Sequence, residues 1–278
     1  MQEYKIKKVC RIIKINRSSY YQKRKDKSNS EKTELELRII YLFRKHKRTK
    51  GKRQIYGILN KGKDKADKVG LPKIARILRD NNLIAKGGAR KRYRPKPEIE
   101  LVIPKYNLIK DKFRVKRLNT LLCADICQLR YKGGWLYISG IMDVANREIV
   151  GYHIATHMRK EIVIESIQMA ADKYKYNKRT VFHSDNGSQY RANATKELLT
   201  SMGIRLSRSR PGKPMDNQPI ESFWKTLRRE LDDISKLSFD KARMIIVEYI
   251  TMNYNSERLH SSLEYLSPLE VRKLKMIA

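Results

Sequence analysis

The chain has 278 residues, 40% of them hydrophobic, and 63 Lys plus Arg against 29 Asp plus Glu give it a formal net charge of +34. That apolar share suffices for a folded core, but no run of about 18 apolar residues occurs, which excludes a membrane-spanning helix. Three cysteines without a Cys-x-x-Cys pair exclude a disulfide scaffold and a zinc ribbon, and with the polar N-terminus they predict a cytoplasmic protein.

The positive charge is concentrated in the first part of the chain. Residues 1–118 carry 38 basic and 11 acidic residues, a net charge of +27, whereas residues 119–278 carry 25 and 18, a net charge of +7. Such an excess is typical of proteins that bind the phosphate backbone of nucleic acids. The plainer alternatives are a basic surface that serves only solubility, or a ribosome-associated protein.

The first part of the chain has helical periodicity. Residues 1–32 are predicted to be a basic helical leader with a linker. Three helices are then expected at 33–47, 53–60 and 73–81, the last opened by Leu71-Pro72. With the basic strip Lys86–Lys96 they resemble a helix-turn-helix, so region 33–96 is predicted to bind DNA. The alternative is a small helical bundle with a solvated charged face. Three prolines between Arg94 and Pro104 indicate an interdomain linker, placed at 97–117.

From residue 118 the periodicity changes to that of an α/β domain. Strands are expected at 121–129, 135–143 and 147–154, with Lys132-Gly133-Gly134 as the first turn. The elements expected after this meander are a helix at 161–174, a strand at 180–183, a helix at 193–202, a strand at 204–206 and helices at 217–234, 241–254 and 269–275. This order predicts an RNase H-like mixed-sheet α/β core over residues 118–278.

Three carboxylates have settings that suit a metal site. Strand alternation places Asp125 on the same face as Cys123 and Cys127, and an acid in such apolar surroundings is costly unless it is paired or binds a metal ion. Asp185 directly follows a short strand, and Glu221 lies near the start of a helix. If the three converge, they make a hard-oxygen site for two Mg²⁺ or Mn²⁺ ions acting at a phosphodiester.

Each acid also has a simpler interpretation. Asp185 could belong to an ordinary Asp–Gly-type turn, and Glu221 could form a surface pair with Lys225, worth a few tenths of a kcal/mol. The 35 residues between Asp185 and Glu221, with a strand just before the first and a helix around the second, favour the metal site. On that helix Glu221, Lys225 and Arg228 share one exposed edge.

Several motifs resemble the catalytic core of the DDE integrase superfamily, and within it the OrfB transposases of the IS-three family of bacterial insertion sequences. The motifs are Gly134-Trp135-Leu136-Tyr137, Asp143, Arg147–Tyr152, His183–Tyr190, Asp216-Asn217, Glu221–Leu231, Tyr254-Asn255, Arg258, His260–Leu263 and Leu266-Ser267-Pro268. Residues 9–21 and 53–92 resemble the OrfB leader, so the resemblance covers nearly the whole chain. The sequence departs from the family at Cys127, where Thr is usual, and at Gln218-Pro219, where a small residue is usual.

The resemblance implies a transposase that cleaves DNA strands at the ends of an insertion sequence and joins the freed 3′-OH to target DNA. It implies Asp125, Asp185 and Glu221 as catalytic metal ligands for two Mg²⁺ or Mn²⁺ ions. The residues expected to contact DNA are Lys225, Arg228, Arg258, His260, Lys91, Arg92 and Arg94.

The expected partners are double-stranded DNA, both terminal repeats and target, further copies of the chain, and an upstream-frame OrfA protein or fusion. A bacterial, nucleoid-associated location follows, with no membrane partner. Two alternatives stay open: an RNase H-like nuclease that hydrolyses without joining, and a non-catalytic DNA-binding module. A strand-transfer product separates the first from a transposase, and metal-dependent nicking excludes the second.

Overall fold

The computed structural model describes residues 33–86, 106–109, 113–210 and 214–277. Several predictions lie outside these ranges: the helical leader at 1–32, most of the 97–117 linker, and the proposed DNA contacts Lys91, Arg92 and Arg94. The division of the chain into domains therefore stays a prediction.

Five strands form one mixed sheet in the order β3-β2-β1-β4-β5. The strands are β1 (Leu121–Tyr131), β2 (Gly134–Asp143), β3 (Glu148–Ala155), β4 (Val181–Ser184) and β5 (Arg205–Arg208). The first three are antiparallel, as the sequence predicts, and β4 and β5 run parallel to β1. The predicted α/β mixed-sheet fold class is confirmed.

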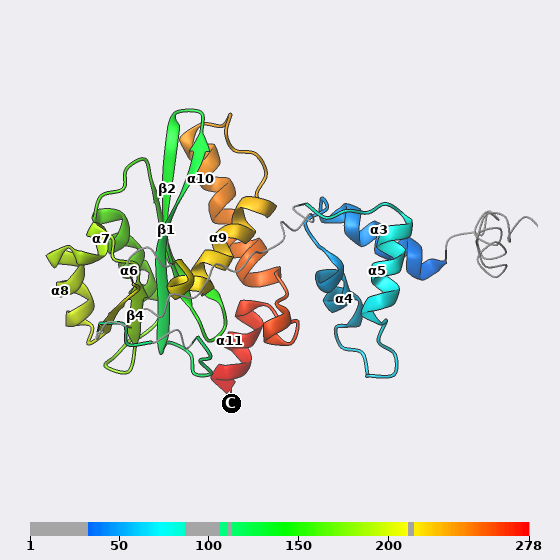
Figure 1. Cartoon of the computed structure of the whole chain (residues 1–278), viewed down its shortest axis with the longest axis horizontal. Helices are drawn as coiled ribbons and strands as arrows, with labels where there is room; N and C mark the ends of the chain where they lie inside the picture. Colours follow the sequence, from blue (N-terminus) through cyan, green and yellow to red (C-terminus); the bar gives the residue numbers. More distant parts are fainter. Residues whose placement is uncertain (1–32, 87–105, 110–112, 211–213, 278) are drawn as a thin grey trace, which may run out of the picture.

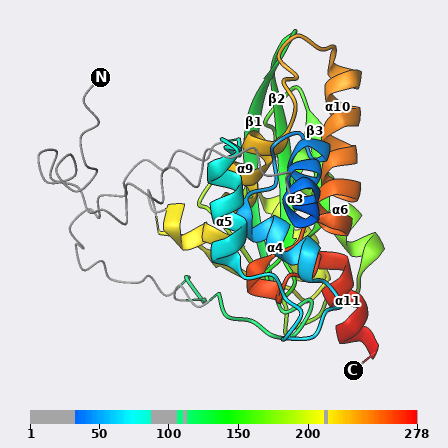
Figure 2. The same ribbon diagram turned by 90° about the vertical axis from the view of Figure 1, so that its right-hand side faces the viewer.

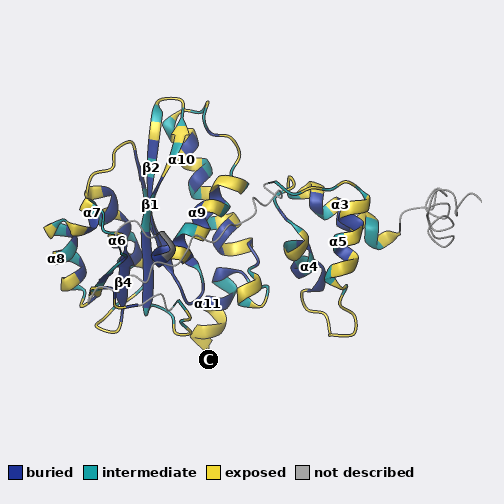
Figure 3. Cartoon of the chain, viewed as in Figure 1, coloured by how far each residue is buried: buried dark blue, intermediate teal, exposed yellow. Residues whose placement is uncertain are grey.

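Helices cover both faces of the sheet (Figure 1). One face carries α6 (Glu161–Lys173), α7 (Ser188–Arg191) and α8 (Asn193–Ser201), and the other carries α9 (Gln218–Glu230), α10 (Phe239–Glu248) and the π-helical segment η2 (Tyr249–Glu257). The alternation of β1 separates the two cores. Cys123 and Cys127 lie in the core with α9, whereas Leu122 and Ala124 lie in the core with α6. Buried residues therefore line both faces of the sheet (Figure 3).

The three predicted N-terminal helices are present as α3 (Glu34–Lys45), α4 (Lys52–Asn60) and α5 (Leu71–Asp80). Thr33 caps the first of them, since its side chain accepts a hydrogen bond from the Glu36 N–H. Their apolar faces form a separate buried cluster whose members all come from residues 35–85. These helices lie beside the C-terminal segment of the core, and α4 contacts the short 3₁₀ helix η3 (Ser261–Leu263) (Figure 2).

The last helix, α11 (Pro268–Ile277), is held to the sheet by one buried arginine. Arg272 pairs with Asp143 at 2.9 Å and also with Glu148, and both carboxylates are fully buried. Its guanidinium lies 3.8 Å from the centre of the Tyr174 ring. No helix in the described ranges is long and apolar enough to cross a membrane.

Some predicted boundaries are wrong. The helix expected at 217–234 ends at Glu230, because Leu231 turns into an extended conformation with ψ of 140°. The helix expected at 241–254 is divided into α10 and η2, where the hydrogen bonding changes to the wider π pattern. The short helix α7 and the 3₁₀ turn η1 (Pro214–Asn217) are not predicted at all.

Candidate active site

Strand register places two of the three predicted acids side by side. In the parallel pairing of β1 with β4, Ala124 lies opposite Ser184, and Asp125 and Asp185 are the next residues on their chains. Neighbouring strands lie about 4.8 Å apart, so Asp185, directly after the end of β4, lies next to Asp125 within β1. The spacing of 59 residues between them in the sequence gives no hint of this register.

Two hydrogen bonds bring the helix of Glu221 to the same point. Asn217, just before α9, donates its amide to the Ala124 carbonyl at 2.8 Å. Trp224 donates its indole N–H to Asp125 Oδ2 at 2.9 Å. Glu221 lies between these two anchors on the first turn of α9, so its carboxylate belongs to the same neighbourhood as Asp125.

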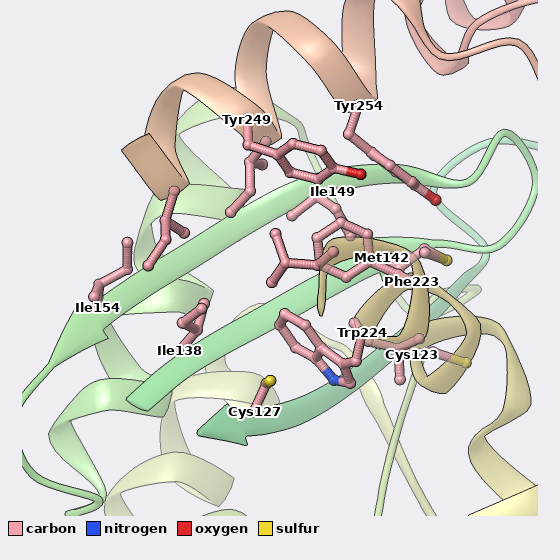
Figure 4. Close-up of a cluster of buried hydrophobic side chains, with 14 of the residues drawn as sticks. Cys123, Cys127, Ile138, Met142, Ile149, Ile154, Phe223, Trp224, Tyr249 and Tyr254 are labelled. Carbon is pink, nitrogen blue, oxygen red and sulfur yellow. The ribbon is translucent and has the colours of Figure 1, made fainter. Parts of the chain in front are cut away.

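The Trp224 indole fits because β2 has a glycine where it packs. Gly140 lies opposite Asp125 in the β1–β2 register. A Cβ at Gly140 would approach Trp224 Cη2 to 2.7 Å, a distance that real Cβ atoms essentially never show. Figure 4 shows Trp224 between α9 and the sheet, beside Cys127.

The segment that leads into α9 is held by buried polar contacts. His183 on β4 is fully buried; its Nδ1 lies 2.9 Å from the Ser207 hydroxyl, and its Nε2 lies 2.8 Å from the Asp216 carbonyl. Burial lowers the pKa of His183 to about 4, so the ring is neutral at neutral pH. Arg210 donates to both carboxylate oxygens of Asp216, at 2.6 and 2.7 Å. These contacts fix where α9 starts relative to β4.

The site concentrates negative charge. Burial, then the charge of Glu221 and that of Asp185, raise the pKa of Asp125 to about 7. Asp185 is exposed, and its Oδ1 accepts a hydrogen bond from the Gly187 N–H at 2.9 Å. The three acids are thus electrostatic neighbours, but in the described ranges no three His, Cys, Asp or Glu side chains are placed so that they could hold one metal ion.

The donor set nevertheless fits a hard divalent cation. The charges of Glu221 and Asp185 both disfavour the ionised form of Asp125, and a bound cation would offset that repulsion. Oxygen donors alone are what Mg²⁺ and Mn²⁺ prefer.

The two predicted cations of α9 differ in their surroundings. Lys225 is exposed, and Arg228 donates to the Cys127 sulfur at 3.1 Å. Cys127 thus contacts α9 at the position where the family usually has Thr. The surface ion pair between Glu221 and Lys225 is not formed among the described residues, and Asp232 pairs with Lys47 and Lys86 of the N-terminal helices.

Two other predicted DNA contacts are largely enclosed. Arg258 is only 9% exposed and pairs with Glu230. His260 has a buried Nε2 without a hydrogen-bond partner in the described ranges. Burial and the charges of Arg258 and Arg147 lower the pKa of His260 to about 3, so it carries no charge for a phosphate at neutral pH. Their DNA contacts stay predictions.

Sequence reasoning missed the residues that support the acids. Asn217 is the N-cap residue of α9, but its side chain makes no capping hydrogen bond and donates to the Ala124 carbonyl instead. Trp224 and Gly140 are not singled out in the sequence. One available signal was the spacing of Trp224, three residues after Glu221, because residues three apart lie on the same side of a helix.

Comparisons with known proteins agree with this architecture. Two models of the integrase core domain match residues 116–214 and 202–268. The 31 kDa protein of insertion element IS600 from Shigella sonnei is 32% identical over 276 residues, which cover 95% of this chain and 97% of that protein. The chain belongs to the IS3 family of insertion-sequence transposases. Its enzyme class is therefore that of the integrase-type transposases.

Further relatives of the transposase are similar along their whole length. The transposase of insertion sequence IS904 from Lactococcus lactis is 30% identical, covering 90% of this chain and 98% of the relative. InsF of IS3A from Escherichia coli K12 is 27% identical, with 96% and 93% coverage. Among solved structures, the catalytic core of HTLV-2 integrase in complex with magnesium has a TM-score of 0.43 at 14% identity, covering 55% of this chain and 95% of that one.

Proposed function

We propose that this transposase cuts DNA strands at the ends of its insertion sequence and joins the freed 3′-OH to target DNA, with Asp125, Asp185 and Glu221 as its catalytic residues. The observation that carries the proposal is the register of Asp125 with Asp185 across β1 and β4, together with the Trp224 bond that ties the helix of Glu221 to Asp125. If Asp185 only formed a surface turn and Glu221 only paired with Lys225, neither the strand register nor the Trp224 hydrogen bond would be needed to bring them near Asp125.

The three carboxylates would hold two Mg²⁺ or Mn²⁺ ions. When bound, the ions would activate the attacking oxygen and stabilise the leaving oxygen of a phosphodiester. The raised pKa of Asp125 supports this role, because a carboxylate enclosed with two other acids is most stable beside a cation. Trp224 would keep Asp125 oriented for such an ion.

Two reactions would follow each other at the site. Water first attacks a phosphodiester at the element end, and the 3′ oxygen leaves as a hydroxyl after taking up a proton. That hydroxyl then attacks a target phosphodiester, giving up its proton, and a new 3′ oxygen leaves. Lys225 and Arg228 would hold phosphates beside the acids, since both lie on α9 within about two turns of Glu221. No covalent link between protein and DNA is involved.

The partners proposed are the terminal repeats and target DNA, further copies of this chain, and an upstream-frame OrfA protein or fusion. Region 33–96 is proposed to bind DNA and region 118–278 to carry the chemistry, in the bacterial cytoplasm at the nucleoid. The separate apolar cluster of α3, α4 and α5 supports that division.

Neutral substitutions of the acids test the proposal. Asp125→Asn, Asp185→Asn and Glu221→Gln should each abolish nicking of an end-labelled duplex in Mg²⁺ and leave duplex binding intact. Glu197→Gln, an exposed acid on α8, is the matched control and should cut normally. Near-normal cutting by any of the three variants would remove that residue from the site. Hydrolysis without any joined product would favour the nuclease alternative.

A further inference from the structure

A basic pocket lies between the N-terminal helices and the C-terminal segment of the core. Its volume is about 760 Å³, and it opens between the start of α4 and residues 258–265. Figure 1 shows α4 facing this segment. The cations that line it are Lys52, Arg53, Lys86, Arg147, Arg229 and Arg258. No Asp or Glu lines the pocket among the described residues, so six positive charges face one space.

Three of these six cations lack an ion pair in the described ranges, whereas Lys86 pairs with Asp232 at 3.6 Å. Lys52, Arg53 and Arg147 form no ion pair in the described ranges. Arg229 and Arg258 share a single acid, Glu230, which is not among the residues that line this pocket. The lowered pKa of His260, also on the wall, reflects the same positive field after burial is counted.

The start of α4 adds donors to the pocket. Gly51 is its N-cap and provides no side-chain hydrogen bond, and the first turn contains Lys52 and Arg53 but no acid. Cations at a helix N-terminus act against the helix dipole, so an anion bound there would offset an unfavourable arrangement of charge. Backbone N–H groups and two cations at one helix start together form a binding site for an anion.

A second pocket provides an internal contrast. It lies on another side of the contact between the N-terminal helices and the core, with a volume of about 370 Å³, and Lys45, Lys47 and Lys50 line it together with Glu230, Asp232 and Glu248. There the opposite charges are balanced within the protein. Of these two pockets at the contact, the first has the excess of one sign.

We propose that the basic pocket binds the phosphate backbone of duplex DNA a few nucleotides away from the bond that reacts. The cations come from α4, the segment before residue 87, the β2–β3 turn, α9 and the C-terminal segment, which suits a row of phosphates better than one small anion. Arg229 follows Glu221 by eight residues on α9, about 12 Å at 1.5 Å per residue. That span equals roughly three to four nucleotides of one strand.

The site would place DNA in contact with both parts of the chain at once. The N-terminal helices and α9 would grip the same duplex, so that binding by the first part presents the strand to the acids. This consequence and the spacing from the reacting bond rest on the proposed function, whereas the binding of DNA to the pocket does not require that the acids cut.

Salt titration tests the pocket without any chemistry. The full-length Lys52→Gln/Arg53→Gln variant and the matched control Lys178→Gln/Arg179→Gln are compared by fluorescence anisotropy with a labelled 30-bp duplex in EDTA. Lys178 and Arg179 are an exposed Lys–Arg pair just before β4 and are not among the residues that line the basic pocket. In the pocket variant the negative slope of log K against log salt should become shallower by about 2, and the affinity for the duplex should fall roughly tenfold. An unchanged slope, or an equal change in the control, overturns the proposal.

A second variant separates binding from stability. Arg147 has φ of +63°, a left-handed conformation that favours glycine. The Arg147→Gly variant should therefore unfold at the same thermal midpoint as the unaltered protein, yet its slope of log K against log salt should become shallower by about 1. Unchanged DNA binding in this variant would exclude the β2–β3 turn from the pocket's role. Because EDTA stops any cutting, a failed nicking experiment with the acid variants leaves these results untouched.

Discussion

Trp224 connects the helix of the candidate site directly to one of the three acids, Asp125 on β1. Its indole donates to Asp125 and fills the space left by Gly140. A buried tryptophan usually finds a hydrogen-bond partner for its indole N–H, and here that partner is a carboxylate, whose direction the bond sets. Trp224 is thus a positioning residue, because in the proposed reaction it acts through Asp125.

Removal of the indole hydrogen bond should mainly raise the Mg²⁺ concentration that nicking requires, with a smaller effect on the free energy of unfolding. Trp224→Phe keeps an aromatic ring but frees Asp125 Oδ2, and partners behind a metal ligand typically contribute 10- to 100-fold to metal affinity or activity. The Mg²⁺ concentration needed for half-maximal nicking should rise about tenfold. Phe223→Leu, at the neighbouring buried position, serves as the control for lost packing. An unchanged Mg²⁺ dependence would make Trp224 a purely structural residue.

A methyl group at Gly140 should strain the same contact. In Gly140→Ala the new Cβ would lie 2.7 Å from Trp224 Cη2 and 3.0 Å from Cζ2, so the free energy of unfolding should fall by about 1–3 kcal/mol. Phenylalanine lacks these outer ring atoms. In a double-mutant cycle measured by urea unfolding, Gly140→Ala should therefore cost less in the Trp224→Phe background. Additive losses would contradict the packing described here.

His260 should make the protein less stable in mild acid. Its pKa is about 3 in the folded chain against 6.5 in the unfolded chain, because of burial and the charges of Arg258, Arg147 and Lys50. Below pH 6.5 the unfolded state binds the extra proton, so stability falls as the pH falls, by about 1 kcal/mol between pH 6 and pH 5. His260→Phe keeps the ring against Tyr254, 5.3 Å away, and should flatten this decline. His183 retains its own contribution. An identical pH profile in both proteins would refute the assignment.

At the scale of elements, sequence patterns predict the strands and helices whose formation depends on a few neighbouring residues. The alternation along Leu121–Leu129 predicts the strand, and the apolar spacing of residues 33–47 predicts the first N-terminal helix, because burial acts over a few residues. The end of α9 is missed since Leu231 keeps the apolar spacing while its backbone leaves the helix. The register of Asp125 with Asp185, and the bond between Trp224 and Asp125, join residues far apart in sequence, and no local pattern encodes them.

Helix α11 depends on the buried arginine that ties it to the sheet. Arg272→Met would leave Asp143 and Glu148 without their main cation in a buried place, which typically costs about 3–5 kcal/mol. Burial raises the pKa of Asp143 and Arg272 opposes that rise, so loss of Arg272 should raise this pKa further and the variant should be less unstable at lower pH. Lys273→Met, on the exposed side of the same helix, should be nearly neutral. Equal unfolding midpoints in urea for these two variants would show that α11 is not anchored through Arg272.

At the scale of the whole molecule, charge and chemistry are distributed differently along the chain. Residues 1–118 carry a net charge of +27, and residues 119–278, which contain all three candidate acids, carry only +7. The apolar cluster of α3, α4 and α5 draws on no residue of the core, so the N-terminal helices have a hydrophobic core of their own. The basic pocket is where the two parts meet.

This distribution predicts that most DNA affinity resides in the first part of the chain. A fragment of residues 1–100 should bind a 30-bp duplex with a steep dependence on salt, because each phosphate that it neutralises releases counterions, with a slope of about −0.9 per contact. A fragment of residues 119–278 should bind the same duplex far more weakly at equal salt, since its excess charge is small and, in the proposed function, three of its acids would face the reacting strand. Anisotropy titrations between 50 and about 200 mM salt measure both slopes. If the first fragment kept its affinity across that range, its binding would not be electrostatic. If the second fragment bound as tightly as the full chain, the N-terminal helices would serve another purpose than holding DNA.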